Sequence, residues 1–304
     1  MKDVIIVGAG PAGLSAAIYV QRSGKSALVL EALTFGGQII NTPDIANYPG
    51  LAHVSGAEFA TNLYNQARDL GAEVLFQRVT GVEDQGDTKV VKTSKGAYPC
   101  RTVILATGAK NRPLGLDNEQ SLIGKGISYC ATCDGMFFRG QDVAVNGGGN
   151  TALEDALFLS NYCRHVTLIH RREGFRGSEE SLNRLREREN VSFVLNAVVD
   201  HLEEEGGRLS AVAVKDKDTG AVTAIPVSGL FVAIGQTPDN TAFENVARLD
   251  PQGYIAAGED CETGTPGVFT AGDCRTKKVR QLTTAASDGA VAALAACEYI
   301  DRQG

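Results

Sequence analysis

The sequence lacks a basic excess, an uninterrupted long apolar run and low-complexity tracts. Acidic residues outnumber Lys and Arg by 36 to 29, which gives a formal net charge of −7 and excludes the basic footprint of a nucleic-acid-binding protein. Residues 4–20 carry no charge, but Gly8, Gly10, Pro11 and Gly13 interrupt the stretch. We therefore expect no nucleic-acid partner and no membrane association.

A paired-cysteine framework is also lacking. The seven cysteines are an odd number, and only Cys130 and Cys133 stand at a motif-like spacing. We expect no cleavable leader before the first apolar run. These features predict a reducing, cytoplasmic location without structural disulfides.

What the chain does contain is typical of a globular protein. Its 304 residues suggest about two domains, since domains usually hold roughly 100–200 residues. Apolar residues make up 43% and charged residues 21%, which excludes intrinsic disorder. The 35 glycines exceed the usual share of roughly 7%, so we expect several places where the backbone turns tightly or approaches a ligand.

The first glycine cluster lies inside a strand–turn–helix–strand pattern. Residues 4–7 and 27–30 are apolar runs typical of buried parallel strands, and residues 14–22 are helical in pattern. The G-x-G-x-x-G spacing from Gly8 to Gly13 lets a pyrophosphate approach the backbone at a helix N-terminus. The alternative is a turn that serves packing alone. The predicted nucleotide-binding residues are Gly8, Gly10, Pro11, Ala12, Gly13 and Glu31, whose carboxylate suits ribose hydroxyls.

The pattern restarts near residue 143. Strand-like residues 143–145, a glycine run, a helical stretch over 151–162 and strand-like residues 166–169 follow in order. The second strand ends in arginines instead of an acid, which favours the 2′-phosphate of NADPH over NADH. A solvated basic patch is the alternative. The predicted nucleotide-binding residues are Gly147, Gly149, Asn150, Thr151, His170, Arg171, Arg172 and Arg176.

Two dinucleotide sites in one chain suggest hydride transfer between two cofactors. The acid-ended site suits FAD, and Gly272-Asp273 in the tail is a further flavin signal. Because the tail has no repeat of its own, we predict that it completes the first unit. The expected fold is α/β, with a Rossmann-like NADPH-binding domain (113–241) inserted into a Rossmann-like FAD-binding domain (1–112 and 242–304).

Cys130 and Cys133 form a Cys-x-x-Cys motif followed by Asp134. This spacing favours a small redox-active disulfide. A zinc site would need a second ligand pair, which the scattered remaining cysteines do not offer, and accidental spacing is the third alternative. Asp134 adjoins the pair and is a candidate acid/base, with capping of the turn before Gly135 as its alternative role.

The motifs together resemble the low-molecular-weight, bacterial-type thioredoxin reductases, within the flavoprotein pyridine nucleotide-disulphide oxidoreductases. The resemblance spans nearly the whole chain and is most specific at Cys-Ala-Thr-Cys-Asp inside the NADPH segment. It implies a homodimer in which NADPH reduces FAD, FAD reduces the cysteine pair, and the dithiol reduces thioredoxin. It implies that Cys133 faces the flavin, Cys130 attacks thioredoxin and Asp134 moves protons. Further cofactor-binding residues carried over are Gly37, Gln38, Asn47, Thr107, Gly108, Gly272, Asp273, Arg280 and Gln281.

The resemblance also implies a rotation of the inserted domain between two half-reactions, about hinges near 109–116 and 236–243. Other partners stay open, namely another thioredoxin-like protein, a peroxiredoxin-linked protein, or oxygen in a dithiol oxidase. A non-catalytic NADPH sensor is a reading of a different class, which the cysteine pair disfavours. No metal site is expected.

Overall fold

The structure, a computed structural model, describes residues 1–42 and 44–303. The chain divides into two compact units, of which the larger combines Met1–Lys110 with Thr237–Gly304 and the smaller is Asn111–Gln236. Each unit is built on a parallel β-sheet covered by helices. The predicted fold class, α/β with one Rossmann-like unit inserted into another, is therefore confirmed. Which cofactor each unit binds stays a prediction.

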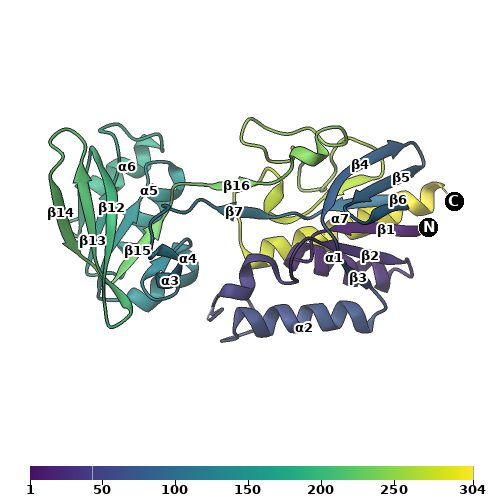
Figure 1. The fold of residues 1–304 in the computed structure, drawn as a ribbon, viewed down its shortest axis with the longest axis horizontal. Coiled ribbons are helices and arrows are strands. Elements are labelled where there is room, and N and C mark those ends of the chain that lie inside the picture. Colours follow the sequence, from purple (N-terminus) through teal and green to yellow (C-terminus); the bar gives the residue numbers. More distant parts are fainter. Residues whose placement is uncertain (43, 304) are drawn as a thin grey trace. The chain divides into compact units, whose positions relative to one another are not determined.

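The larger unit is organised around a mainly parallel sheet, shown at the right of Figure 1. Its strands follow the order β3-β2-β1-β6, with β17 on the other side of β6. Strand β6 is shared: its first half pairs antiparallel with β5, and its second half pairs parallel with β1. The β4–β5 hairpin thereby extends the sheet. The strands are β1 (Lys2–Val7), β2 (Ala27–Glu31), β3 (Glu73–Phe76), β4 (Val79–Gln85), β5 (Thr88–Thr93), β6 (Gly96–Leu105) and β17 (Val268–Thr270).

Successive strand residues point to opposite faces of this sheet, so the sheet has an apolar core on each face. Helices cover one of these faces. Val4 and Ile6 join a core with helices α1 and α7, whereas Ile5 and Val7 face a second core with the hairpin. Pro11 begins α1, where a missing N–H costs nothing. The Ser55 hydroxyl caps α2 by accepting from the Glu58 N–H. The helices are α1 (Pro11–Arg22), α2 (Gly56–Asp69) and α7 (Leu282–Gln303), with 3₁₀ turns η1 (Gly37–Asn41), η3 (Thr241–Phe243) and η4 (Gly272–Cys274).

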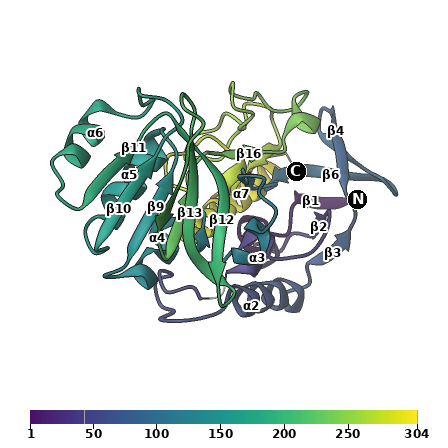
Figure 2. The same cartoon turned by 60° about the vertical axis from the view of Figure 1, so that its left-hand side comes forward.

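The smaller unit repeats the plan with a parallel sheet in the order β11-β10-β9-β15-β8. Val143 and Val145 on β9 face the helices α5 and α6, while Ala144 faces a three-stranded antiparallel sheet, β12–β13–β14. Figure 2 shows β9, β10 and β11 side by side in this unit. The parallel strands are β8 (Ile127–Ser128), β9 (Asp142–Asn146), β10 (His165–Ile169), β11 (Val191–Val194) and β15 (Gly229–Val232).

Parts of the smaller unit lie outside the motifs that the sequence contains. The antiparallel sheet and α6 lie between the recognised motifs, where we made no prediction. The elements without a prediction are β12 (Ala197–Glu205), β13 (Arg208–Asp216), β14 (Val222–Pro226), α3 (Glu119–Leu122), α6 (Glu179–Arg186) and η2 (Gly135–Phe138). Helix α5 (Asn150–Leu159) confirms the helix expected over 151–162, and α4 (Ala131–Asp134) carries the Cys-x-x-Cys motif. The two chain crossings between the units are short strands that pair with each other, β7 (Ala109–Asn111) and β16 (Gln236–Pro238).

Candidate active site

The first glycine turn connects β1 to α1 in the larger unit. Gly8 has a φ of +109°, and a Cβ built there would lie 2.3 Å from the Ala106 carbonyl oxygen, so glycine alone fits. A Cβ built on Gly10 would lie 3.9 Å from the Gly37 Cα. Gly10 and Gly37 thus bring two backbone segments without side chains together at the carboxyl end of the sheet. Doubly wound folds bind nucleotides at this end.

Glu31 ends β2 beside this turn. One carboxylate oxygen accepts from the Ala9 N–H at 2.8 Å, and the other accepts from the Leu33 N–H at 2.9 Å. These bonds fix the carboxylate against the turn and leave it further lone pairs for hydroxyl donors.

The remaining predicted residues of the larger unit gather at the same edge of the sheet. The Gln38 amide donates to the Ala109 carbonyl, and the Thr107 hydroxyl donates to Asn240 at 2.7 Å. The Asn47 amide lies 3.4 Å from the Gln281 side-chain oxygen. The Arg280 guanidinium covers the Tyr254 ring, 4.2 Å from its centroid. Segments that are up to 234 residues apart in sequence therefore line one region.

Asp273 follows β17 in η4 and is the most informative acid of this unit. Its Oδ1 atom is buried and, among the residues that the structure describes, has no hydrogen-bond partner. Burial raises the pKa of this carboxyl group, opposed by Lys277 and Arg280. A buried oxygen of this kind usually has a partner, so the site fits a ligand that brings a hydroxyl donor.

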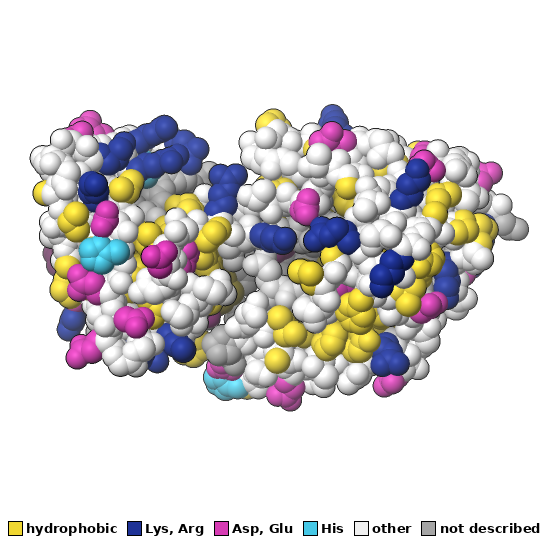
Figure 3. Space-filling model, viewed as in Figure 1, with side chains coloured by type: hydrophobic (Ala, Val, Ile, Leu, Met, Phe, Trp, Pro, Cys, Tyr) yellow, Lys and Arg dark blue, Asp and Glu magenta, His cyan; other side chains and the backbone are white. Residues whose placement is uncertain are grey.

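The second glycine turn connects β9 to α5 in the smaller unit. The carbonyl oxygen of Gly148 accepts from the N–H groups of Arg176 and Gly177, which fastens the following loop to the turn. Arg171, Arg172 and Arg176 have exposed side chains. Figure 3 shows Lys and Arg side chains gathered over the part of this unit where α6 lies. The predicted basic cluster thus stands beside the turn.

His170 lies differently from its arginine neighbours. It is 5% exposed, stacks on Phe175, and its ring would collide with any Cβ on Gly148. Burial is the main cause that lowers its pKa. The neutral ring therefore packs directly against Gly148 in the glycine turn. The sequence did not indicate this contact.

The cysteine pair occupies the same edge of the same unit. Cys130 and Cys133 form a disulfide with a Cα–Cα distance of 5.3 Å, and both are half-buried. They follow β8, whereas the glycine turn follows β9, and β15 lies between these two strands. Asp134 completes the short helix α4, and burial raises the pKa of its carboxyl group.

Comparison with known proteins decides the family. Residues 2–289 match the family described as pyridine nucleotide-disulphide oxidoreductase. The chain belongs to this family. It is 39% identical to the thioredoxin reductase of Bacillus subtilis strain 168, over 98% of this chain and 95% of that protein. It is 40% identical to the thioredoxin reductase of Peptoclostridium litorale, over 98% and 97%.

Solved structures agree. The thioredoxin reductase of Streptococcus pyogenes MGAS5005 has a TM-score of 0.95 to this chain, at 38% identity and 99% coverage of both chains. The resemblance inferred from the sequence is therefore confirmed, and the chain is an oxidoreductase of the thioredoxin reductase type. In the described part of this oxidoreductase, no helix is long and apolar enough to cross a membrane.

A buried ion cluster beside Asp273 escaped the sequence reasoning. Asp288 on α7 accepts from Arg275 Nε at 2.8 Å and Nη2 at 2.9 Å, and from Lys277 Nζ at 2.9 Å. It also accepts from the Gly272 N–H at 2.9 Å. These hydrogen bonds of Asp288 connect α7 to η4 in this oxidoreductase. The only sequence signal was an acid within an otherwise apolar helix stripe, close to two cations.

We expect Asp288→Asn to lower the free energy of unfolding by about 3–5 kcal/mol, because it leaves Arg275 and Lys277 as buried cations without a full counter-charge. Thermal and urea unfolding of the purified protein measure the effect. Asp301→Asn, which weakens an exposed ion pair between Lys25 and the same helix, is the control and should lower Tm only slightly, because exposed ion pairs contribute little to stability. Equal stability of Asp288→Asn and the parent would contradict the role given to the cluster.

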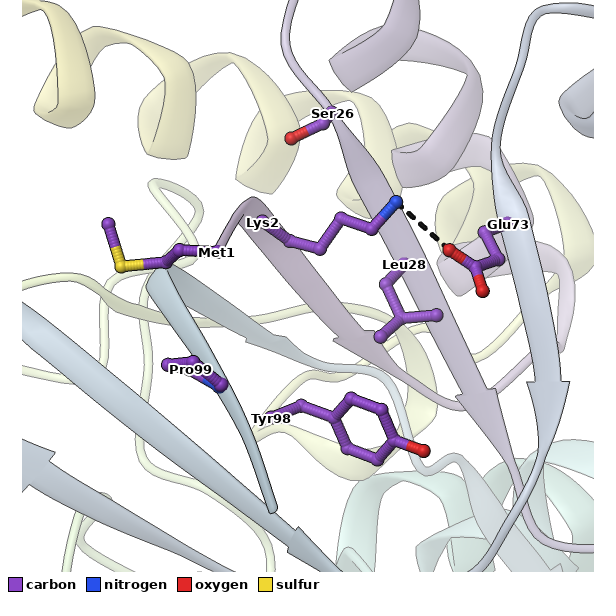
Figure 4. Close-up of a pocket in the computed structure, with 7 residues that line it drawn as sticks. All are labelled: Met1, Lys2, Ser26, Leu28, Glu73, Tyr98 and Pro99. Atoms are coloured by element: carbon purple, nitrogen blue, oxygen red, sulfur yellow. Dashed lines mark ion pairs between the residues drawn. The ribbon is translucent and has the colours of Figure 1, made fainter. Parts of the chain in front are cut away.

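A surface hollow lies elsewhere on the larger unit, as Figure 4 shows. Its volume is about 420 Å³, and an ion pair of 2.9 Å between Lys2 and Glu73 crosses it. Both residues belong to the amino ends of the parallel strands. Because the glycine turns stand at the opposite ends, this hollow belongs to neither predicted nucleotide site.

Proposed function

We propose that this oxidoreductase catalyses the NADPH-dependent reduction of a thioredoxin disulfide, with FAD bound to the larger unit. The observation that carries the proposal is the Cys130–Cys133 disulfide, held on the same unit as the arginine-flanked glycine turn. A sensor that only bound a nucleotide would have no use for such a pair. The relatives named thioredoxin reductase support thioredoxin as the partner.

The residues of the larger unit fit FAD. Gly10 and Gly37 leave backbone free of side chains where a pyrophosphate would lie, and the Glu31 carboxylate retains acceptors for ribose hydroxyls. The partnerless Asp273 Oδ1 fits a ribityl hydroxyl. We therefore assign the flavin to the region lined by these residues, with Gln38, Asn47, Thr107, Arg280 and Gln281 around it.

The smaller unit fits NADPH. Its glycine turn opens α5, whose N-terminus attracts a pyrophosphate. Arg171, Arg172 and Arg176 supply guanidinium groups for a 2′-phosphate, and this stretch holds no acid where NADH-specific folds place one. Glu173 stands within the stretch, but it is exposed and pairs with Asn196 at 3.5 Å.

When bound, the flavin would accept two electrons from NADPH and supply them to the disulfide. Residues of the chain itself carry out the thiol–disulfide exchange and the proton transfer that follow. The reduced pair is a dithiol, and the Cys130 thiolate attacks one sulfur of the thioredoxin disulfide to give a mixed disulfide. Cys133 then attacks Cys130, which restores the enzyme disulfide and releases a thioredoxin dithiol. Asp134 supplies the proton that a leaving thiolate needs.

The insertion topology supports a rotation between half-reactions. The cysteine pair and the NADPH turn share one unit, so the two cannot reach one flavin face together. Strands β7 and β16 are the only covalent crossings between the described units. A cross-link that freezes them should stop turnover and spare one half-reaction. Full activity of the cross-linked enzyme would exclude the rotation.

We further propose a cytoplasmic homodimer, as the family resemblance implies. Size-exclusion chromatography with light scattering tests this, and a monomer at assay concentration would contradict it.

The experiment that tests the function is spectroscopic. The purified protein should be yellow, and anaerobic NADPH should bleach it more efficiently than NADH. Oxidised thioredoxin encoded by the same genome should then restore the colour. A colourless protein that does not take up FAD would exclude the flavin. A bleached protein reoxidised by oxygen but not by thioredoxin would replace thioredoxin reduction by dithiol oxidation.

A further inference from the structure

Ser128 occupies a fixed place beside the cysteine pair. It is the last residue of β8 and is 4% exposed. Its backbone is aligned with Phe231 on β15, and the neighbouring Gly126 carbonyl accepts from the Leu230 N–H at 2.7 Å. The strand pairing therefore sets the position of this hydroxyl independently of the loop that follows.

The hydroxyl joins two parts of the redox loop. Ser128 Oγ lies 2.6 Å from Asp134 Oδ2, the distance of a charge-assisted hydrogen bond in which the hydroxyl donates. The same oxygen accepts from the Cys130 N–H at 3.0 Å. A longer contact of 3.3 Å to the Cys130 carbonyl would compete for the one hydroxyl proton, and the shorter bond takes it.

We infer that Ser128 is a positioning residue that aims the Asp134 carboxyl at the Cys130–Cys133 pair for proton transfer. This inference rests on the proposed function, because it concerns the reaction of the dithiol with a thioredoxin disulfide. In that step one S–S bond of thioredoxin breaks, one S–S bond forms between Cys130 and Cys133, and two thiols appear on thioredoxin. The two thiol protons of the enzyme match the two that thioredoxin gains, so a group that carries protons between sulfurs suffices.

The surroundings of Asp134 make the hydroxyl its principal polar contact. Burial raises the pKa of the carboxyl group, and the hydrogen bond from Ser128 opposes this rise. Helix α5, which packs against α4, carries the acids Glu154 and Asp155, and the adjoining turn η2 carries no titratable group. The buried hydroxyl of Tyr162 lies against Gly135, and burial raises the pKa of this phenol, so it stays neutral. Tyr129 is engaged elsewhere, since its hydroxyl donates to the buried Glu119.

A second role of the same bonds is to hold the acid still. Ser160 provides the contrast in this unit, because it is also buried but its hydroxyl donates only to the Leu157 carbonyl of its own helix, at 2.8 Å. Losing the Ser160 hydroxyl removes a local bond. Losing the Ser128 hydroxyl frees the acid and leaves the Cys130 N–H without this acceptor.

The test uses the flavin-loaded enzyme, reduced beforehand and mixed with oxidised thioredoxin from the same genome. For Ser128→Ala we expect the rate of thioredoxin reduction to fall about tenfold, less than the roughly 10²–10⁴-fold typical of removing a general acid or base outright. The rate should also decline at a higher pH than in the parent, because the buried carboxyl has lost the bond that favours its charged form. Ser128→Thr keeps a hydroxyl and should restore most of the rate.

Controls separate the outcomes. Ser160→Ala should leave both the rate and the pH profile unchanged, and flavin content with thermal unfolding verifies that each variant folds. If the alanine variant is insoluble, Ser128→Gly removes the same hydroxyl without adding volume or a thiol, so it gives the same test. Failure of the parent to reduce thioredoxin would overturn the proposed function. A working parent with a Ser128 variant of identical rate and pH profile would overturn the positioning role alone.

Discussion

Cys133→Ser is expected to lower NADPH-driven thioredoxin reduction by at least about 10³-fold, because the variant cannot close the enzyme disulfide that resolves the mixed disulfide. NADPH should still bleach its flavin at a rate close to that of the parent. Steady-state thioredoxin assays and anaerobic stopped-flow absorbance measure the two effects separately. Cys130→Ser should lose the same overall activity.

The two cysteine variants should differ in trapping. Cys133→Ser should form a mixed disulfide with a single-cysteine thioredoxin activated by Ellman's reagent, whereas Cys130→Ser should not. Cys163→Ala is the matched control, since Cys163 is a buried free cysteine of the same unit. Trapping by Cys130→Ser instead would reverse the roles assigned to the pair, and normal turnover by either variant would remove the pair from the mechanism.

Replacing Arg171, Arg172 and Arg176 together by alanine is expected to lower kcat/KM for NADPH by about 10²–10³-fold and to leave kcat/KM for NADH nearly unchanged. A hydrogen bond to a charged group contributes about 1.5–3 kcal/mol, and several such bonds to a 2′-phosphate vanish together. Flavin reduction by each nucleotide, followed over a range of concentrations, gives both constants.

Arg184→Ala is the control for this prediction, because Arg184 is an exposed arginine on the neighbouring helix α6. It should change neither constant, apart from a small effect of lowered positive charge that salt screens. An equal loss with NADPH and NADH would mean that the cluster supports the fold of the loop and does not read the 2′-phosphate.

The sequence predicted those parts of the site in which the backbone geometry allows only one type of residue. Gly8 must be glycine because of its positive φ and its contact with the Ala106 carbonyl. Such constraints require glycine at fixed positions, so the G-x-G-x-x-G motif is visible in a single sequence. The sequence also predicted the insertion of one unit into the other. The tail after the second glycine motif contains no such motif of its own, so we expected it to complete the first unit.

The parts that the sequence did not predict depend on side-chain contacts that appear only when the chain is folded. Asp288 binds Arg275 across 13 positions, and its place as an acid in an apolar helix stripe does not identify this partner. Ser128 looks like an ordinary strand residue until the loop brings Asp134 to its hydroxyl. His170 stays a predicted nucleotide-binding residue, but the packing of its buried ring against Gly148 is a contact that the sequence did not indicate. Each of these roles arises from tertiary packing, to which a single sequence gives little access.

The most direct test of the central claim counts electrons. In an anaerobic mixture of enzyme, NADPH and excess oxidised thioredoxin from the same genome, the NADPH consumed is compared with the thioredoxin thiols formed. We expect one NADPH oxidised per thioredoxin dithiol in the parent, and in Cys130→Ser and Cys133→Ser no consumption beyond the single NADPH that reduces each flavin. NADPH oxidation without thiol formation, or thiol formation that persists without the cysteine pair, would contradict it.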